Sequence, residues 1–164
     1  MPLDDDKIIY GVYDSKQVTE KNREELFEQI KNTALDFDIQ EVGQDVIDEF
    51  NILQATKLGM KRVIENLKIK PELALIDAVA NIDSNVDQVA IIKGDATSYS
   101  IACASILAKV YRDHLMQKYD EEYKIYGFAK HKGYGTSEHI AVLKERGPCK
   151  LHRKTFIKNF VRTK

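Results

Sequence analysis

The sequence contains no tryptophan, two cysteines and three prolines, and it has no long apolar run. Cys103 and Cys149 are too few and too far apart for a disulfide framework or a cysteine metal cluster, so we expect reduced thiols and a cytoplasmic location. No stretch reaches the roughly 18 apolar residues of a membrane helix, so we expect no membrane partner. The first residues are acidic where a signal peptide is basic, and we expect no leader.

The remaining composition is that of a folded protein. The chain has 164 residues, of which 43% are hydrophobic and 31% charged, and this excludes a disordered or collagen-like chain. A chain of this length buries about 70% of its unfolded surface, which is enough for a core. There is no internal repeat, low-complexity segment or Gly/Ser linker, so we predict one domain over residues 1–164.

The net charge of −1 hides a strong asymmetry along the chain. Residues 93–164 contain 15 basic and 7 acidic side chains, whereas residues 1–92 contain 10 basic and 19 acidic ones. The excess is concentrated at the end, because residues 124–164 contain 11 basic and 2 acidic side chains. This asymmetry indicates a polyanionic partner such as nucleic acid. The alternative is a solvated basic surface that binds nothing, and charge alone does not choose between them.

Apolar periodicity predicts helices that alternate with strands. Thr19 is a candidate N-cap because polar residues follow it and then Leu26, Phe27 and Ile30 recur at helical spacing. Further helices are predicted over residues 52–67, from Ser98 or Ser100 to about Tyr119 or beyond, and over residues 137–146. Strands are predicted over residues 8–12, 35–39, 73–76 and 89–92. The last two are continuous apolar runs, typical of parallel strands buried on both faces, so the fold class is α/β.

Two carboxylates follow the two apolar strands. Asp77 comes directly after Leu75-Ile76, and Asp95 comes shortly after Ile91-Ile92. If the strands are parallel neighbours, both acids lie at the edge of the sheet where α/β proteins bind ligands. Clustered carboxylates repel unless a cation lies between them, and hard oxygen ligands select Mg²⁺ or Mn²⁺. The alternative is that both acids are polar residues that close their strands.

A basic, glycine-rich segment from Lys130 to Thr136 places Tyr134 between two glycines. Glycine allows close approach to a ligand, an aromatic ring can stack on a base or sugar, and lysine can contact phosphate. The alternative is a surface turn in which the tyrosine is an anchor. Two smaller polar clusters lie near the two ends of the chain. Asp14 to Lys16 is predicted to form a turn, and His152 to Lys154 adds cations near the C-terminus.

In their order along the chain and in their residues, these motifs resemble those of ribonuclease HII, the type 2 ribonuclease H family. The resemblance covers nearly the whole chain and implies a ribonuclease H-like α/β fold, a mixed sheet flanked by helices. The segments that carry it are Asp14 to Val18 with Arg23-Glu24, Asn51-Ile52 with Ala55 to Lys57, Leu75 to Asp77, Lys93 to Asp95, Ser100 to Asp113, Tyr126 to Thr136, and His152-Arg153 with Phe156.

The resemblance implies an endonuclease that cleaves the RNA strand of RNA/DNA hybrids and nicks DNA duplexes beside an embedded ribonucleotide. It implies hydrolysis with two Mn²⁺ or Mg²⁺ ions, for which Asp77 and Asp95 are the catalytic metal ligands. It places Tyr134 against the sugar that bears the 2′-hydroxyl, the group that distinguishes RNA from DNA. No obligate protein partner is implied. The candidate phosphate contacts are Lys16, Lys109, Lys132 and Arg153.

One departure from the family pattern concerns the beginning of the chain. The family opens with a strand bearing Asp-Glu-Ala-Gly-Arg-Gly and a second strand follows it, but Asp4-Asp5-Asp6 has no such glycines or arginine. We therefore expect an N-terminally truncated domain in which residues 35–39 lack their usual neighbour. Because two of the family's four active-site acids are missing, we expect weak or no activity. The alternative function is a non-catalytic nucleic-acid-binding fragment.

Overall fold

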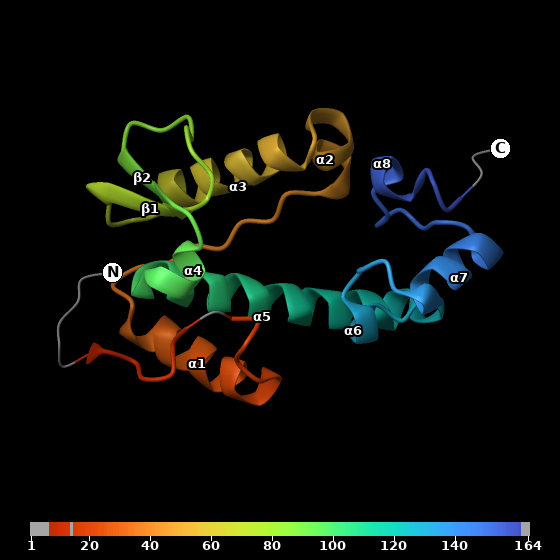
Figure 1. The fold of residues 1–164 in the computed structure, drawn as a ribbon, viewed down its shortest axis with the longest axis horizontal. Coiled ribbons are helices and arrows are strands. Elements are labelled where there is room, and N and C mark those ends of the chain that lie inside the picture. The colour runs from red at the N-terminus through yellow and green to blue at the C-terminus, as the bar shows by residue number, and fades with distance from the viewer. Residues whose placement is uncertain (1–6, 14, 162–164) are drawn as a thin grey trace. The chain divides into compact units, whose positions relative to one another are not determined.

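Helices make up most of the structure, and two short parallel strands form its sheet (Figure 1). The computed structural model describes residues 7–13 and 15–161, so Asp14 and the Asp4-Asp5-Asp6 run lie outside the described residues. In this part, no helix is long and apolar enough to cross a membrane. The elements are α1 (Glu20–Thr33), α2 (Gln44–Phe50), α3 (Ile52–Asn66), β1 (Leu73–Asp77), β2 (Asp87–Ile91), α4 (Gly94–Thr97), α5 (Tyr99–Glu122), the 3₁₀ helix η2 (Lys124–Tyr126), α6 (Phe128–His131), α7 (Ser137–Arg146) and α8 (Lys154–Ile157).

The chain divides into two compact units. The first unit consists of Met1–Glu41 with Thr56–Val110, and the second consists of Val42–Ala55 with Tyr111–Lys164. Helices α3 and α5 each have residues in both units. The α/β fold class predicted from the sequence is confirmed, whereas the single domain over residues 1–164 stays a prediction.

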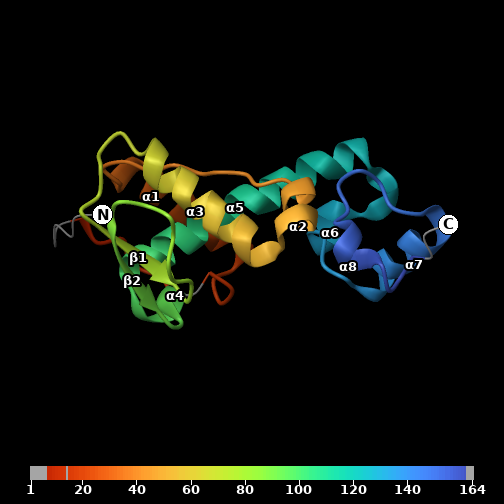
Figure 2. The ribbon, with the colours of Figure 1, turned by 90° about the horizontal axis from the view of Figure 1, so that it is seen from above.

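The core of the first unit is made by α1 and the first part of α5, which lie side by side (Figures 1 and 2). Leu26, Phe27 and Ile30 of α1 pack against a cluster on α5 in which Ile106 and Val110 are at most 1% exposed. The predicted N-cap of α1 is confirmed, because the Thr19 hydroxyl accepts a hydrogen bond from the backbone N–H of Asn22 at 3.3 Å. Such a cap stabilises a helix by about 1 kcal/mol.

The sheet is parallel, as the apolar runs predict, but it is buried on one face only. Ile76 is 6% exposed and packs with Ile64 of α3, which lies along this face (Figure 1). On the opposite face Leu73, Leu75 and Val89 are 49%, 39% and 45% exposed. The predicted burial on both faces is therefore wrong. The physical reason for the error is that an apolar run shows only that the side chains of the strand are hydrophobic. It does not show whether another element packs on each face.

Two predicted strands are also wrong, because residues 8–12 and 35–39 form neither helix nor strand. A strand needs a neighbour to satisfy its backbone groups, and each of these segments is instead held to the rest of the chain by a hydrogen bond that involves a side chain. The N–H of Ile9 donates to the Tyr99 hydroxyl at 2.8 Å, and the chain then turns at Gly11, whose φ is +85°. The Asp36 carboxylate accepts from the N–H groups of Lys68 and Ile69, which holds residues 35–39 as an extended connection.

The second unit packs short helices around the C-terminal part of α5. Its core contains Met116, Tyr126, Phe128 and Leu143, and Figure 2 shows α6, α7 and α8 close together there. The predicted helix over residues 137–146 is confirmed as α7, with the Thr136 hydroxyl as its N-cap. Asp48 of α2 accepts hydrogen bonds from the backbone N–H groups of residues 154 and 155, so α2 anchors the start of α8.

Candidate functional site

Asp77 and Asp95 lie at the same end of the sheet. Asp77 is the last residue of β1 and pairs in register with Ile91, the last residue of β2. After β2 the chain turns into α4, and Asp95 lies in the first turn of this helix. The expectation that parallel strands deliver both acids to one edge is thus met by the backbone.

Gly94 connects these two positions. Its backbone N–H donates a hydrogen bond to Oδ1 of Asp77 at 2.8 Å. A Cβ at residue 94 would lie 2.5 Å from Cδ1 of Ile101 and 3.4 Å from Cα of Asp77, so only glycine fits without displacement. Lys93 before it adopts a left-handed conformation, with φ of 56°, which directs the chain from the strand into α4. Sequence reasoning did not identify this contact, although Gly94 was within the motif.

Lys16 lies beside the second carboxylate. Its Nζ is 3.6 Å from Oδ2 of Asp95, and the two side chains are 78% and 13% exposed. The turn that carries Lys16 is well anchored: Ser15 is buried with its hydroxyl 2.9 Å from that of Ser105, and Arg23 donates to the carbonyls of Ser15 and Val18. The structure therefore brings together Asp77, Asp95 and Lys16 of the predicted set. Lys109 is half-buried on α5 of the same unit.

The two acids suit a hard divalent cation in part. Both supply only carboxylate oxygens, which Mg²⁺ and Mn²⁺ prefer. Over residues 7–13 and 15–161, however, no group of three or more His, Cys, Asp or Glu side chains is arranged to hold a metal ion. Mg²⁺ is commonly bound by one or two carboxylates and completed by water and substrate phosphate. The pair therefore fits an ion shared with a phosphate better than an ion held by the protein alone.

Tyr134 projects from a tight turn in the second unit. It is 65% exposed, and it follows Lys132 and Gly133, whose φ values of 50° and 82° are both left-handed. Arg112 of α5 donates to the Lys132 carbonyl at 3.2 Å and so supports the turn. A side chain at residue 133 would be strained at this φ and would lie 3.3 Å from Cε of Met116. The turn exposes the Tyr134 ring to solvent, and Lys132 beside it is half-buried.

Arg153 and His152 differ in character, although the sequence groups them as cations. The Arg153 guanidinium is half-buried, with its Cζ 3.6 Å from the centre of the Phe156 ring. Burial lowers the pKa of Arg153, and the nearby charge of Arg112 lowers it further. His152 is 7% exposed, and its burial lowers its pKa. The interpretation of His152 as a surface cation is wrong, because packing against Tyr126 and Phe128 removes it from water.

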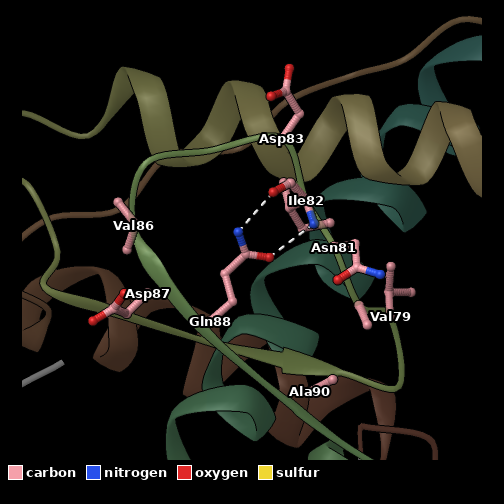
Figure 3. Close-up of a pocket in the computed structure, with 9 residues that line it drawn as sticks. Val79, Asn81, Ile82, Asp83, Val86, Asp87, Gln88 and Ala90 are labelled. Carbon is pink, nitrogen blue, oxygen red and sulfur yellow. Dashed lines mark hydrogen bonds between the residues drawn. The ribbon is translucent and has the colours of Figure 1, made fainter.

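A separate hollow of about 500 Å³ lies beside β2 (Figure 3). It is formed by the connection between β1 and β2, and Gln88 braces its rim by bonding both the N–H and the carbonyl of Ile82. Asp83 on the same connection pairs with Lys61 at 2.5 Å. This hollow contains none of the candidate residues, so we assign it no role in the site.

Comparison with solved structures defines the class of protein. The fold is similar to the crystal structure of the ribonuclease H2 from Pyrococcus horikoshii OT3, with a TM-score of 0.73 and 25% identity over 88% of this chain and 76% of that chain. It is also similar to ribonuclease HII in its complex with PCNA from Archaeoglobus fulgidus, with a TM-score of 0.74 and 27% identity over 94% of this chain and 82% of that chain. The chain is therefore an α/β protein of the ribonuclease H type.

Sequence comparison identifies the family. The ribonuclease HII family profile matches residues 4–163. The ribonuclease HII of Caldicellulosiruptor bescii is 51% identical over 97% of this chain and 77% of its own length. That of Acetivibrio thermocellus is 49% identical over 97% of this chain and 62% of its own length. The chain belongs to the ribonuclease HII family, a family of endonucleases, and the resemblance inferred from the motifs is confirmed.

Proposed function

We propose that this chain hydrolyses the RNA strand of RNA/DNA hybrids and nicks DNA duplexes beside an embedded ribonucleotide, with Asp77 and Asp95 as ligands of Mn²⁺ or Mg²⁺. The observation that carries the proposal is the delivery of both carboxylates to one end of a parallel sheet, with Asp77 held by the N–H of Gly94. Family membership supports the nuclease chemistry.

The candidate residues of the first unit each have a distinct role in the proposed reaction. The N–H of Gly94 donates to Oδ1 of Asp77, and Oδ2 of the same carboxylate would bind the cation. Asp95 carries the second carboxylate, and the ammonium of Lys16 beside it binds a phosphate of the substrate. Two divalent ions bound there would activate a water molecule and neutralise the leaving 3′ oxygen. Lys109 is a further candidate phosphate contact.

The second unit supplies recognition in this proposal. The exposed ring of Tyr134 packs against the sugar that bears the 2′-hydroxyl, which is the difference between RNA and DNA. Lys132 in the same turn and Arg153 near α8 bind phosphates and hold the duplex in register. The 11 basic and 2 acidic side chains of residues 124–164 support a polyanionic ligand.

We further propose that activity is weak, because two carboxylates give an ion few protein ligands. The test is a nicking assay on a DNA duplex with one ribonucleotide, with Mn²⁺ and with Mg²⁺. Asp77→Asn and Asp95→Asn should each abolish nicking. Asp87→Asn is the matched control, because Asp87 is exposed at the opposite end of β2 and its replacement should leave the rate unchanged. Nicking that survives Asp77→Asn would refute the assignment.

A second candidate function is nucleic-acid binding without cleavage. It is favoured by the basic C-terminal region together with the finding that, in the described part of the chain, no three potential ligands converge on a metal site. It predicts duplex binding that weakens steeply with salt, with a slope set by the number of phosphates contacted. Salt-sensitive binding without nicking at any metal concentration would select this function over hydrolysis.

We also propose that the protein works in the cytoplasm. Cys103 and Cys149 are free thiols, and free thiols are typical of proteins in a reducing compartment. Fractionation of cells that express a tagged chain tests this location, and recovery from a membrane or secreted fraction would contradict it.

A further inference from the structure

Three buried histidines lie directly beneath the turn that carries Tyr134. His131, His139 and His152 are 7%, 4% and 7% exposed, and the rings of His131 and His139 stack with centroids 4.1 Å apart. Nε2 of His139 lies 3.0 Å from Nε2 of His152. Within the described residues, no group of three or more His, Cys, Asp or Glu side chains is arranged to hold a metal ion.

The hydrogen bonds determine which nitrogen of each ring carries the proton. Nδ1 of His139 lies 2.9 Å from the carbonyl of Tyr134, which can only accept, so Nδ1 of His139 is protonated. In a neutral ring its Nε2 then accepts, and the proton between the two rings belongs to Nε2 of His152. Nδ1 of His152 must accept in turn, and the N–H of Cys149 donates to it at 3.0 Å. The Cys149 thiol and carbonyl lie 3.2 Å and 3.3 Å from the same Nδ1. The Nε2–H form of His152 satisfies the shorter backbone contact, from the Cys149 N–H, and leaves the longer carbonyl contact without a proton.

This network holds the backbone of Tyr134 on both sides. The Tyr134 carbonyl accepts from His139, while its N–H donates to the carbonyl of His131 at 2.8 Å. The N–H of Gly133 donates to Nδ1 of His131 at 3.1 Å. The phenol of Tyr134 itself points outward and is 65% exposed, so these bonds orient a surface ring and do not fill the core.

We propose that His139, kept in its Nδ1–H form by His152, is a positioning residue that sets the Tyr134 ring for recognition of the ribonucleotide. The inference deepens the proposed function and rests on it, since it requires that Tyr134 contacts the sugar. Burial lowers the pKa of both His139 and His152, which favours the neutral forms that the network needs.

Two polar variants of His139 separate positioning from a general structural role. The amide of asparagine occupies the place of Nδ1 and can still donate to the Tyr134 carbonyl, whereas the amide of glutamine occupies the place of Nε2 and cannot. Binding of a DNA duplex with one ribonucleotide and of the same duplex without it is measured by fluorescence anisotropy. His139→Gln should lower the preference for the ribonucleotide about fivefold, the effect of one lost hydrogen bond, and leave all-DNA binding unchanged.

His139→Asn should retain the preference, and His114→Gln, at an exposed position on α5, is the control. Equal behaviour of His139→Asn and His139→Gln overturns the proposal. Should His139→Gln fail to fold, histidine ¹⁵N shifts of the unchanged protein decide: an Nδ1–H signal for His139 and an Nε2–H signal for His152 support the proposal, and any other pattern overturns it.

The proposed function fails separately. If the unchanged chain shows no preference for the ribonucleotide, the role of Tyr134 is refuted and the inference falls with it. If Tyr134→Ala abolishes the preference while His139→Gln keeps it, the proposed function stands and only the positioning role of His139 is refuted.

Discussion

Gly94 donates its backbone N–H to Oδ1 of Asp77 across 2.8 Å, so the residue that precedes one candidate metal ligand orients the other. The two acids are 18 positions apart in the sequence, yet one short turn couples them. Any change to the backbone at residue 94 therefore acts on both carboxylates at once.

The first prediction concerns Gly94→Ala. The added methyl group would lie 2.5 Å from Cδ1 of Ile101, so either Ile101 or the turn that donates to Asp77 must shift. We expect a loss of nicking of at least about tenfold and a destabilisation of about 1–3 kcal/mol. Ile101→Val removes that Cδ1 atom, and the double variant should regain part of both losses. Rates and urea unfolding measure the effect. A double variant no better than Gly94→Ala would show that the clash is not the cause.

The second prediction separates binding from stability at Lys16. Its pair with Asp95 is exposed on the lysine side, so Lys16→Met should change the free energy of unfolding by less than about 1 kcal/mol. Loss of one phosphate contact should nevertheless weaken duplex binding and reduce the slope of log affinity against log salt by about 1. Lys21→Met, at an exposed position on α1, is the control. An unchanged salt slope would exclude Lys16 from phosphate binding.

The third prediction is a loss of stability in acid. The pKa values of His139 and His152 lie below the ordinary value of 6.5, chiefly because both rings are buried, and the charge of His131 adds to the effect. Above pH 6.5 the folded and unfolded states are both neutral at these rings, and their full stabilisation is present. As the pH falls below 6.5, the unfolded state binds protons that the folded state excludes, so stability decreases until the folded pKa values are passed.

Thermal melts from pH 8 to pH 5 measure this decrease. The double variant His139→Asn with His152→Gln removes both ionisable rings and should show a shallower decrease in Tm over the same range. Parallel curves for the two proteins would mean that other groups dominate the acid response.

The fourth prediction tests the one-sided burial of the sheet. Leu75→Thr and Val89→Thr replace residues that are 39% and 45% exposed, and each should cost less than about 1.5 kcal/mol. Ile76→Ala, at a position 6% exposed, should cost about 2–5 kcal/mol. Urea unfolding measures all three. Comparable losses at Leu75 and Ile76 would indicate that the open face is covered in solution.

Local features were predictable from the sequence, and those that depend on distant packing were not. The cap at Thr19 and the helix over residues 137–146 follow from residues a few positions apart, whereas the cap at Thr136 was not predicted. The parallel strands followed from two apolar runs, and the common edge of Asp77 and Asp95 followed from the strands.

The buried state of His152 shows why the remainder was missed. Its neighbours in sequence are Arg153 and Lys154, which indicate a charged surface, but Tyr126 and Phe128 cover its ring from elsewhere in the chain. The segment at residues 35–39 has the alternation of a strand, yet a strand forms only where another strand supplies backbone partners. In both cases the deciding contact comes from residues that local patterns do not include.

Lys93 and Lys132 both adopt the left-handed conformation, with φ values of 56° and 50°. Each is followed directly by a glycine. A side chain in this region costs about 1–2 kcal/mol relative to ordinary backbone. The turn beside Asp77 and the turn that carries Tyr134 are therefore both strained, and in each turn the strained residue is a positively charged lysine. Selection for thermal stability should therefore favour glycine or asparagine at these two positions. The resulting proteins should unfold at a higher temperature but bind a polyanion more weakly.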